Sequence, residues 1–551
     1  MTVDMHKHAA GLIPYFLSDQ NNERYAFVQR RSKDARRNPD VFGLFGGGIE
    51  AGETPEQGLH REILEELNID LELPAFKEAL TTLGTYDYAD SFGKVRAHEY
   101  TLLVTPDFEK QVKIGEGQYG IFMSESEIRA SGEFLEGHRQ MILDFFISIR
   151  SPRIILGIET SCDETALSLV RTQGRNVQVL GHELISQIDI HRPYGGVFPV
   201  LAKREHGRNL VPLLEKILFD EAAKIEDATT LPTVAWNGAS EAVLAEIRII
   251  LAREAELLAL FEKFIERHSS SATPKTPLTR PAVDMIAVTE GPGLEPALWV
   301  GVGFAKALAL LWNIPIMPIN HMEGHIVASL LTTQSHSGLA ELAKPPLPAL
   351  SLLISGGHTE LVLVSALGSY EIIGKTRDDA VGEAFDKVAR ILGMPYPGGP
   401  QISALAKTVT ASQYTLPRPM IHSKDLDFSF SGLKTAALYL TKEIEKTRPL
   451  TDADKAEIAY ETEQAIAEVL TKKTTLAIEQ HNTQSLIIGG GVIANKVLRG
   501  AFETLTKQYS IPLFLPTSDL STDNAIMIAV AATLKGASSQ RAPIVKGNLS
   551  L

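Results

Sequence analysis

Three glutamates in the first quarter of the chain have the spacing of a metal site. Glu62 and Glu66 lie four residues apart, and Glu65 is beside them. Residues four apart share a helix face, and carboxylates gathered there repel one another unless a cation neutralises them. Oxygen ligands suit Mg²⁺ or Mn²⁺, which can bridge a diphosphate and activate water for attack on phosphorus. The alternative is a solvated acidic helix face, which is common in Glu-rich segments.

The residues around these glutamates form a longer motif. It is similar to the Nudix box and departs from it only at Asn68, where the family has glycine: Gly47-x5-Glu53-x7-Arg61-Glu62-Ile63-Leu64-Glu65-Glu66-Leu67-Asn68-Ile69. After glycine, asparagine best tolerates the left-handed conformation that closes a helix. The resemblance covers about residues 10 to 147. It implies hydrolysis of a nucleoside diphosphate linked to another group, with Mg²⁺ or Mn²⁺ on Glu62, Glu65 and Glu66 and with Glu65 also catalytic.

A second candidate metal site combines two histidines with a distant aspartate. His321 and His325 are four residues apart, so on a helix both imidazoles can reach one metal ion. Asp523, in Thr522-Asp-Asn-Ala-Ile-Met-Ile-Ala529, offers a third ligand. Glu323 lies about 200° around the helix from His321, so it is badly placed to act as the general base of an H-E-x-x-H metallopeptidase. This geometry disfavours a peptidase.

Glycine-rich turns follow several apolar strands in the second half of the chain. They occur at Leu353 to Thr359, Tyr396 to Pro400 and Ile487 to Asn495. Backbone amides without side chains let a phosphate or an adenosine approach closely. One such turn alone is more often only a tight turn. Several turns together with a candidate metal site favour a nucleotide site.

Nine motifs in chain order together resemble the tRNA N(6)-adenosine threonylcarbamoyltransferase family, once described as O-sialoglycoprotein endopeptidases. They are Leu156 to Thr165, Gly291 to Leu294, His321 to His325, Ile354 to Thr359, Gly382 to Lys387, Pro397 to Pro400, Phe428 to Thr435, Gly489 to Asn495 and Thr522 to Ala529. The resemblance runs from about residue 153 to 540. Glu295-Pro296 departs from it, because relatives usually carry small or apolar residues there.

The resemblance implies a reaction and a set of site residues. Threonylcarbamoyl would pass from threonylcarbamoyl-AMP to the N(6) amine of the adenosine 3′ of the anticodon, in tRNAs that read ANN codons, releasing AMP. His321, His325 and Asp523 would hold Fe²⁺ or Zn²⁺, and Asp163 and Glu164 are catalytic candidates. Accessory proteins of the threonylcarbamoyladenosine complex are expected partners. The adenylate would contact Leu353, Ile354, Ser355, Gly356, Gly357, Asp386, Gly399 and Asn495, with Asp386 on the ribose and Asn495 on the base side.

These sites require an α/β protein of at least two domains. Arg150-Ser-Pro-Arg153 is a plausible linker, because a new apolar strand, Ile154 to Ile158, follows it. We expect a Nudix α/β/α sandwich over residues 1–150. A two-lobed actin-like or sugar-kinase-like ATPase fold should follow over residues 153–540. Residues 155–165 and 350–359 resemble each other loosely, as the two halves of a duplicated phosphate-binding fold would.

A helical insertion is expected at about residues 219–282. Ser240 to Arg267 has apolar residues at helical spacing and predicts one long amphipathic helix, followed by a Ser- and Pro-rich loop, Ser269 to Pro281. The favoured interpretation is a helix that packs on its own domain. The alternative is a docking helix for the front domain or for a partner.

Composition limits the remaining possibilities. The chain has 551 residues and one cysteine, Cys162, which excludes an intrachain disulfide and a cysteine-based zinc site and suits the cytoplasm. No signal peptide or membrane span is expected. The net charge of −14 argues against non-specific nucleic-acid binding. One local basic cluster, more simply interpreted as a solvated loop, comprises Arg30, Arg31, Lys33, Arg36 and Arg37.

Two other functions remain open for the second domain. An ATP-dependent kinase or ATPase of the same fold would transfer phosphoryl groups without the His321, His325 and Asp523 metal. A non-catalytic scaffold for RNA or a partner would not depend on these residues at all. The substrate of the front domain is not specified. One hypothesis is that this domain removes a nucleotide that competes for the second cleft.

Overall fold

The computed structural model describes residues 7–18, 23–35, 38–90, 93–220, 231–236, 238–268, 278–333, 339–535 and 540–551. Arg36 and Arg37 of the basic cluster and most of the loop predicted after Arg267 lie outside these residues. The chain forms two compact units. The first consists mainly of the residues up to Ser151, and the second of Pro152–Lys535 with Gln540–Leu551.

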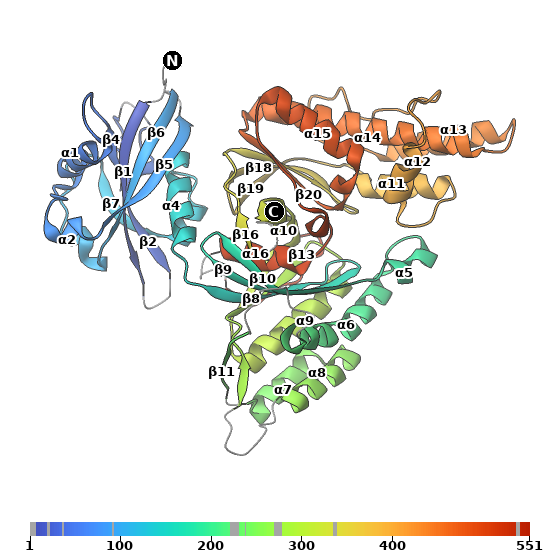
Figure 1. Cartoon of the computed structure of the whole chain (residues 1–551), viewed down its shortest axis with the longest axis horizontal. Coiled ribbons are helices and arrows are strands. Elements are labelled where there is room, and N and C mark those ends of the chain that lie inside the picture. Colours follow the sequence, from blue (N-terminus) through green and yellow to red (C-terminus); the bar gives the residue numbers. More distant parts are fainter. Residues whose placement is uncertain are drawn as a thin grey trace. The chain divides into compact units, whose positions relative to one another are not determined.

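The first unit is a mixed sheet between helices (Figure 1). Its strand order is β3-β2-β1-β6-β5, with β4 also paired to β1 and β7 to β2. Helix α1 packs its apolar side chains against one face of the sheet. Helix α4 covers the other face, where Phe145 contacts Tyr15. The strands are β1 (Lys7–Leu17), β2 (Arg24–Arg30), β3 (Phe42–Gly43), β4 (Phe45–Gly48), β5 (Leu80–Asp90), β6 (Gly93–Leu103) and β7 (Tyr119–Ser124); the helices are α1 (Pro55–Leu67), α2 (Pro74–Lys77), α3 (Glu125–Ala130) and α4 (Glu136–Ser148).

Local signals fix both ends of α1. The Thr54 side chain accepts a hydrogen bond from the Gln57 amide and the Gln57 side chain bonds back to Thr54, which completes a capping box. At the other end Asn68 adopts φ 55°, in the left-handed region. The interpretation that asparagine replaces glycine as a helix-ending residue is confirmed.

The second unit contains two sheets of one repeated topology. In the first sheet β8, β9 and β10 form an antiparallel meander, and β13 and then β14 add parallel strands beside β8. In the second sheet β17, β18 and β19 form the meander, and β20 and β21 are the added strands. The loose similarity of residues 155–165 and 350–359 therefore marks the first hairpin of each sheet.

The first lobe is built on the sheet that contains β8. Its strands are β8 (Arg153–Glu159), β9 (Glu164–Gln173), β10 (Asn176–Ser186), β13 (Met285–Gly291), β14 (Ile316–Asn320), β15 (Leu331–Thr333) and β16 (Leu339–Leu342). Its helices are α5 (Ile188–His191), α6 (Pro199–Phe219), α9 (Glu295–Trp312), α10 (His321–Ser329) and α16 (Ala525–Ala531). Glu295-Pro296, the departure from the family pattern, opens α9, where proline fits the first helical turn.

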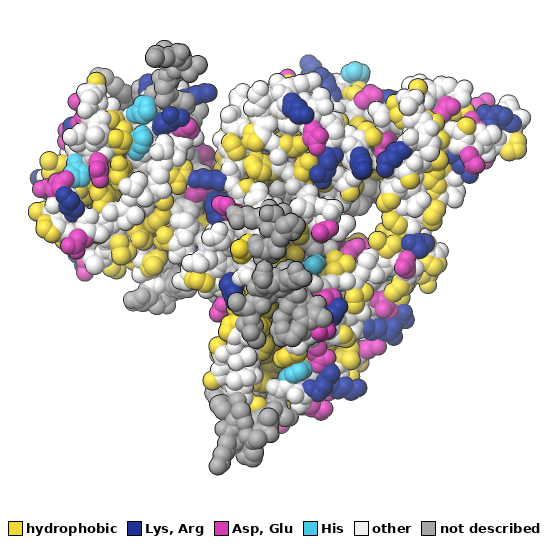
Figure 2. All heavy atoms as spheres, in the orientation of Figure 1, with side chains coloured by type: hydrophobic (Ala, Val, Ile, Leu, Met, Phe, Trp, Pro, Cys, Tyr) yellow, Lys and Arg dark blue, Asp and Glu magenta, His cyan; other side chains and the backbone are white. Residues whose placement is uncertain are grey.

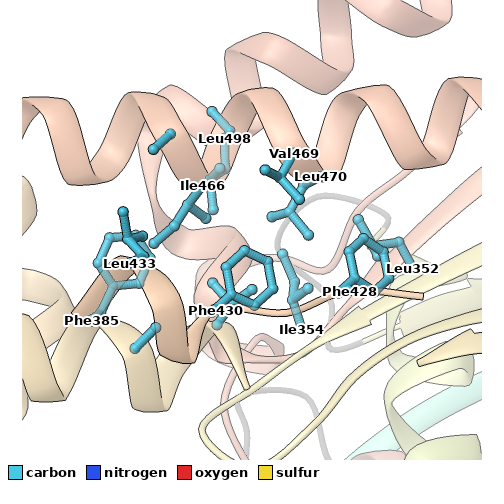
Figure 3. Close-up of a cluster of buried hydrophobic side chains, with 14 of the residues drawn as sticks. Leu352, Ile354, Phe385, Phe428, Phe430, Leu433, Ile466, Val469, Leu470 and Leu498 are labelled. Atoms are coloured by element: carbon cyan, nitrogen blue, oxygen red, sulfur yellow. The ribbon is translucent and has the colours of Figure 1, made fainter. Parts of the chain in front are cut away.

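The second lobe packs long helices on the sheet that contains β17. Its strands are β17 (Ala349–Ile354), β18 (Thr359–Ala366), β19 (Ser369–Lys375), β20 (Ser485–Gly489) and β21 (Leu513–Phe514). Its helices are α11 (Val381–Ile391), α12 (Gly398–Ala406), α13 (Ser431–Glu445), α14 (Asp452–His481) and α15 (Lys496–Tyr509). Figure 3 shows the core: Ile466 and Leu470 of α14 face Phe428, Phe430 and the sheet residue Ile354.

The prediction of one long helix over Ser240 to Arg267 is wrong. The segment forms two helices, α7 (Glu241–Ile250) and α8 (Ala255–His268), between the short paired strands β11 (Thr233–Ala235) and β12 (Thr279–Pro281). The buried positions Leu251 and Leu257 are six residues apart, which on one helix would place them on different faces. The break lets both helices bury their apolar residues on α6 and α9, with Phe261 5.8 Å from Phe304 between ring centroids. Packing on its own domain, the favoured interpretation, is confirmed.

One described helix, α9, is long and apolar enough to cross a membrane by length and composition. It packs against α6 and β13, and most of its residues are buried in the first lobe. Figure 2 shows acidic and basic side chains interspersed on the face in view. In the predicted basic cluster, Arg30 pairs with Asp40 and Glu133 rather than facing solvent alone.

Candidate active sites

Helix α10 presents the two histidines of the second unit. It follows β14 directly, and the Asn320 side chain caps its first turn by accepting from the Met322 amide. His321 and His325 are one turn apart and both are buried. Helix α10 packs on α16, and Asp523 immediately precedes the residue that caps α16, Asn524. Two capped helix starts therefore set these three side chains opposite one another.

The three side chains form a compact donor group. Asp523 Oδ1 lies 3.4 Å from His321 Nε2 and 3.2 Å from His325 Nε2, and one ligand atom from each residue lies within 4.8 Å of the others. Burial opposes ionisation of Asp523, but the two histidines outweigh it and hold the pKa of this carboxyl low. Among the described residues no other group of His, Cys, Asp or Glu meets this spacing.

Glu159, which the sequence reasoning missed, orients His321. It ends β8, is fully buried, and its Oε2 lies 3.2 Å from His321 Nδ1. The Ser161 amide and the Thr289 hydroxyl donate to its two oxygens at 2.6 and 2.5 Å. A carboxylate behind a histidine fixes which ring nitrogen faces the metal. An acidic residue at the end of an otherwise apolar buried strand was the available signal.

The chemistry of this donor set fits a transition-metal ion. His321 has its Nδ1 side occupied by Glu159 and turns Nε2 toward Asp523. His325 is 1% exposed; its Nδ1 has no hydrogen-bond partner among the described residues, and its Nε2 lies 3.2 Å from Asp523 Oδ1 but outside hydrogen-bond geometry. Buried imidazole nitrogens left in this state are costly unless a ligand satisfies them. Two imidazoles and one carboxylate suit iron or zinc.

Glu323 does not belong to this group. Its carboxylate pairs with Lys535 Nζ at 2.6 Å, and the side chain is 1% exposed. The expected orientation away from the histidine face is therefore observed. The base that an H-E-x-x-H peptidase requires is not available at this position.

Glycine-rich loops of the second lobe lie against α10. A β-carbon on Gly489 would meet the carbonyl oxygen of His325 at 2.8 Å, and one on Gly490 would meet that of Ile354 at 2.4 Å. The loop of Ser355, Gly356 and Gly357 follows β17, and Gly382 at the start of α11 lies against the Cα of Gly356. Ile354 thus lies against Gly490, next to the glycine that contacts His325, the loop from Ser355 to Gly357 continues from it, and Leu353 is buried in β17.

His358, in the same turn, was not among the predicted site residues. Its amide bonds to the Ser355 hydroxyl at 3.2 Å. Burial first, and then the charges of His321 and His325, lower the pKa of His358 to about 4. It is therefore a neutral imidazole near the candidate metal ligands at physiological pH.

Asp386 and Gly399 are brought together, whereas Asn495 has local partners. The Gly398 amide donates to Asp386 Oδ1 at 2.6 Å, so Asp386 binds the first turn of α12. Asn495 caps α15 through Oδ1 and donates from Nδ2 to Glu463 at 2.5 Å. A contact from Asn495 to a base would have to replace the bond to Glu463.

Asp163 ends the turn between β8 and β9, and Glu164 begins β9. Burial is the main cause that raises the pKa of each carboxyl, and the charge of Asp523 raises both further. The Asp163 carbonyl accepts from the Gln187 amide, which fixes the turn. The pair is thus a place where a proton can be held near the donor group.

The glutamates of the first unit are arranged differently. Glu66 is buried and accepts from the Gly46 amide at 2.7 Å, and burial raises its pKa to about 7. The carboxylate of Glu62 lies over Gly47, where a β-carbon would meet it at 2.4 Å, and it pairs with Arg61 at 2.6 Å. Arg61 also donates two hydrogen bonds to Glu53, which fixes the orientation of its guanidinium. Glu62 and Glu66 therefore converge on β4, while Glu65 is exposed.

Comparison with known proteins identifies both units. The family model for tRNA N6-adenosine threonylcarbamoyltransferase matches residues 178–231 and 264–530, and the NUDIX domain model matches residues 7–145. A tRNA N6-adenosine threonylcarbamoyltransferase of Burkholderia multivorans is 40% identical over 385 residues, 69% of this chain and 92% of the relative. One of Chromobacterium violaceum is 39% identical over 383 residues, 69% of this chain and 93% of the relative.

This chain belongs to the tRNA N6-adenosine threonylcarbamoyltransferase family. It carries a Nudix hydrolase domain in front of the transferase, and both expected folds are confirmed. The unmatched stretch between residues 231 and 264 contains β11, α7 and the larger part of α8. Among solved structures, the NUDIX domain of Shewanella oneidensis NrtR complexed with ADP ribose is 17% identical, covers 25% of this chain and 85% of that chain, and has a TM-score of 0.21.

Membership of the two families has two general consequences. It makes tRNA a substrate of the transferase and supports dependence on divalent metal ions. It also favours acyl-type transfer over the kinase or ATPase alternative and over a non-catalytic scaffold.

Proposed function

We propose that the second unit transfers threonylcarbamoyl from threonylcarbamoyl-AMP to the N(6) amine of the adenosine 3′ of the anticodon, in tRNAs that read ANN codons, and that this protein acts in the cytoplasm. The observation that carries this proposal is the buried group of His321, His325 and Asp523 beside glycine-rich loops. His321, His325 and Asp523 would hold Fe²⁺ or Zn²⁺. The metal ion would polarise the carbamoyl carbonyl and stabilise the charge that develops on it.

The side chains around this group supply binding, orientation and proton transfer. The amides of Ser355 to Gly357 can approach the adenylate phosphate, because no side chain blocks the two glycines. Asp386, fixed by the Gly398 amide, faces the ribose in our proposal. A bond forms between the adenosine amine and the carbamoyl carbon, and the bond from that carbon to the phosphate oxygen breaks. AMP leaves, and the Asp163 and Glu164 pair accepts the proton lost by the amine.

A direct assay tests this proposal. The full-length protein, with bacterial accessory proteins, is given unmodified tRNA and threonylcarbamoyl-AMP, and threonylcarbamoyladenosine is quantified. His321→Ala should abolish transfer and reduce the bound metal, and Thr332→Val, an exposed substitution beyond α10, is the matched control. Equal transfer by wild type and His321→Ala would refute the proposed metal role. No transfer by folded wild type with its partners would refute the transferase assignment for this chain.

For the first unit we propose hydrolysis of a nucleoside diphosphate derivative with Mg²⁺ or Mn²⁺. Glu62, Glu65 and Glu66 would hold the ion, with Glu65 also catalytic, and the contacts of Glu62 and Glu66 with the glycines of β4 support this. The test measures the phosphate-ester products that form when a panel of nucleoside diphosphate derivatives is incubated with the protein and either Mg²⁺ or Mn²⁺. Glu62→Gln should lose this activity and keep threonylcarbamoyl transfer.

A further inference from the structure

A chain of buried hydrogen bonds in the first lobe ends on the loop that carries Asp163. Its members are Gln187, just before α5, His191, which ends α5, and His206 of α6, and all three side chains are 0% exposed. Buried polar side chains are costly unless their hydrogen bonds are made. None of the three is among the residues assigned to metal or adenylate binding.

The bonds of His206 fix its tautomer. Its Nε2 lies 3.0 Å from the carbonyl oxygen of Cys162, so Nε2 carries the proton and donates. Nδ1 then accepts from the Thr165 hydroxyl at 2.8 Å and from the side-chain amide of Gln187 at 3.4 Å. Burial lowers the pKa of His206 to about 4, so the ring is neutral near pH 7. One ring orientation therefore satisfies both nitrogens.

His191 continues the chain in the same direction. The backbone amide of Phe198, at the start of α6, donates to its Nδ1 at 3.2 Å, which leaves the proton on Nε2. That Nε2 lies 3.2 Å from Gln187 Oε1 and donates to it. Every donor thus points from the start of α6 toward the Cys162 carbonyl. Hydrogen bonds aligned in one direction polarise and strengthen one another.

The chain holds two consecutive carbonyl groups of the loop. His206 donates to the carbonyl of Cys162, and the backbone amide of Gln187 donates to that of Asp163 at 2.9 Å. These carbonyls belong to the two peptide units on either side of Asp163, so their position sets the direction of its side chain and of Glu164 after it. Helix α6, which supplies both ends of the chain, packs on β9 and α9. The loop is therefore fixed to a rigid frame.

We propose that His206 and Gln187 are positioning residues of the transferase, which hold Asp163 and Glu164 where this pair accepts the proton of the attacking adenosine amine. The N–H bond of the amine breaks as an O–H bond forms on a carboxylate of the pair. This inference rests on the proposed transfer reaction. Displacement of a reacting group by about 1 Å can cost a hundredfold in rate. Loss of the chain should therefore lower kcat and leave substrate binding intact.

Steady-state transfer by the full-length protein with bacterial accessory proteins tests this assignment. His206→Leu should lower kcat roughly tenfold to a hundredfold, with bound metal and KM for tRNA and for threonylcarbamoyl-AMP unchanged. His206→Gln should restore most of kcat, because its side-chain amide can still donate to the Cys162 carbonyl. Gln187→Leu should lower kcat in the same way, and it carries the test if His206→Leu does not fold. His182→Leu is the matched control, since His182 is a half-buried histidine of the same lobe that bonds the backbone of Leu167.

A double-variant cycle separates positioning from general stability. Glu164→Gln alone should lower kcat, and adding His206→Leu should lower it little further, because both changes disable the same pair. Wild-type kcat in His206→Leu and Gln187→Leu would overturn the positioning role. Losses that multiply in the double variant, or a loss that His206→Gln does not restore, would also overturn it. If folded wild type shows no transfer with its partners, the proposed reaction falls and the positioning role falls with it.

Discussion

The two candidate metal sites differ in how far the protein alone assembles them. In the transferase, two imidazoles and one carboxylate lie within 4.8 Å of one another. In the Nudix domain, Glu66 is bound to Gly46, Glu62 to Arg61, and Glu65 is exposed. A carboxylate attracts histidines, whereas three carboxylates repel one another until a cation arrives. The transferase site is therefore preformed, and the hydrolase site is completed by its ion and substrate.

The largest effect is expected from the ligand on which both histidines converge. Asp523→Ala leaves His321 and His325 buried without their shared carboxylate, so we expect transfer to fall at least about a hundredfold and bound metal to be lost. Hydrolysis by the Nudix domain should not change. Transfer assays and elemental analysis on the same preparation measure this. Transfer close to wild type would show that the preformed group is not the catalytic metal site.

Loss of a Nudix carboxylate should affect activity and stability in opposite directions. Glu66→Gln removes a proposed metal ligand, so hydrolysis should fall on the order of a hundredfold. Without metal, however, the domain should be as stable as wild type or more stable, because the substitution removes a buried carboxyl. Hydrogen exchange in α1 and β4 reports this stability. Destabilisation without metal would contradict the contrast between a preformed site and an ion-completed one.

The carboxylate behind His321 should have an intermediate effect. Glu159→Gln keeps the shape of the side chain but weakens the orientation of the imidazole, and a loss of about 10–100-fold in metal affinity is expected. Metal titration against a competing chelator measures it, with Ser168→Ala, another buried polar substitution in the first lobe, as control. An unchanged affinity would mean that Glu159 only completes the core.

The stability of the Nudix domain should depend on pH through a buried carboxyl, that of Glu99. Burial raises the pKa of Glu99 from 4.5 to about 8. Between these values the folded domain holds a proton that the unfolded chain has released, so its stability falls as pH rises through this range, by roughly 2–4 kcal/mol. Hydrogen exchange in β1 and β6 at pH 5 and pH 8 measures the effect. Glu99→Gln should flatten it, and a slope that persists in the variant would exclude Glu99 as its source.

The smallest effect is expected at Asn68. The residue already adopts φ 55°, so Asn68→Gly should change the stability of the Nudix domain by less than about 1 kcal/mol. Asn68→Val should be clearly more destabilising, because a β-branched residue strains this conformation. Thermal unfolding of the three proteins is the measurement. Equal stability of the glycine and valine variants would contradict the helix-ending role.

Sequence alone predicted the elements whose signals are local. The helix-ending role of Asn68 and the four-residue spacing of His321 and His325 each depend on neighbours within one helix, so both signals are visible in the chain. The repeated topology of the two sheets was suggested only weakly, since strand pairing joins residues far apart. The break between α7 and α8 was missed, although the six-residue step from Leu251 to Leu257 interrupts the helical period.

Buried polar residues explain most of what was missed at the sites. The roles of Glu159 and His206 depend on partners that distant segments of the chain supply. Asn495 shows the converse, since its side chain caps α15 and bonds Glu463. A motif gives the position of such a residue but not the hydrogen bonds that it already makes.

The most direct test of the account measures both activities on the same preparations of full-length wild type, His325→Ala and Glu62→Gln. Threonylcarbamoyl transfer to tRNA and hydrolysis of the best nucleoside diphosphate probe are followed side by side. We predict that His325→Ala loses only transfer and that Glu62→Gln loses only hydrolysis. Loss of transfer in Glu62→Gln, or retention of transfer in His325→Ala, would contradict two separate metal sites with separate chemistry.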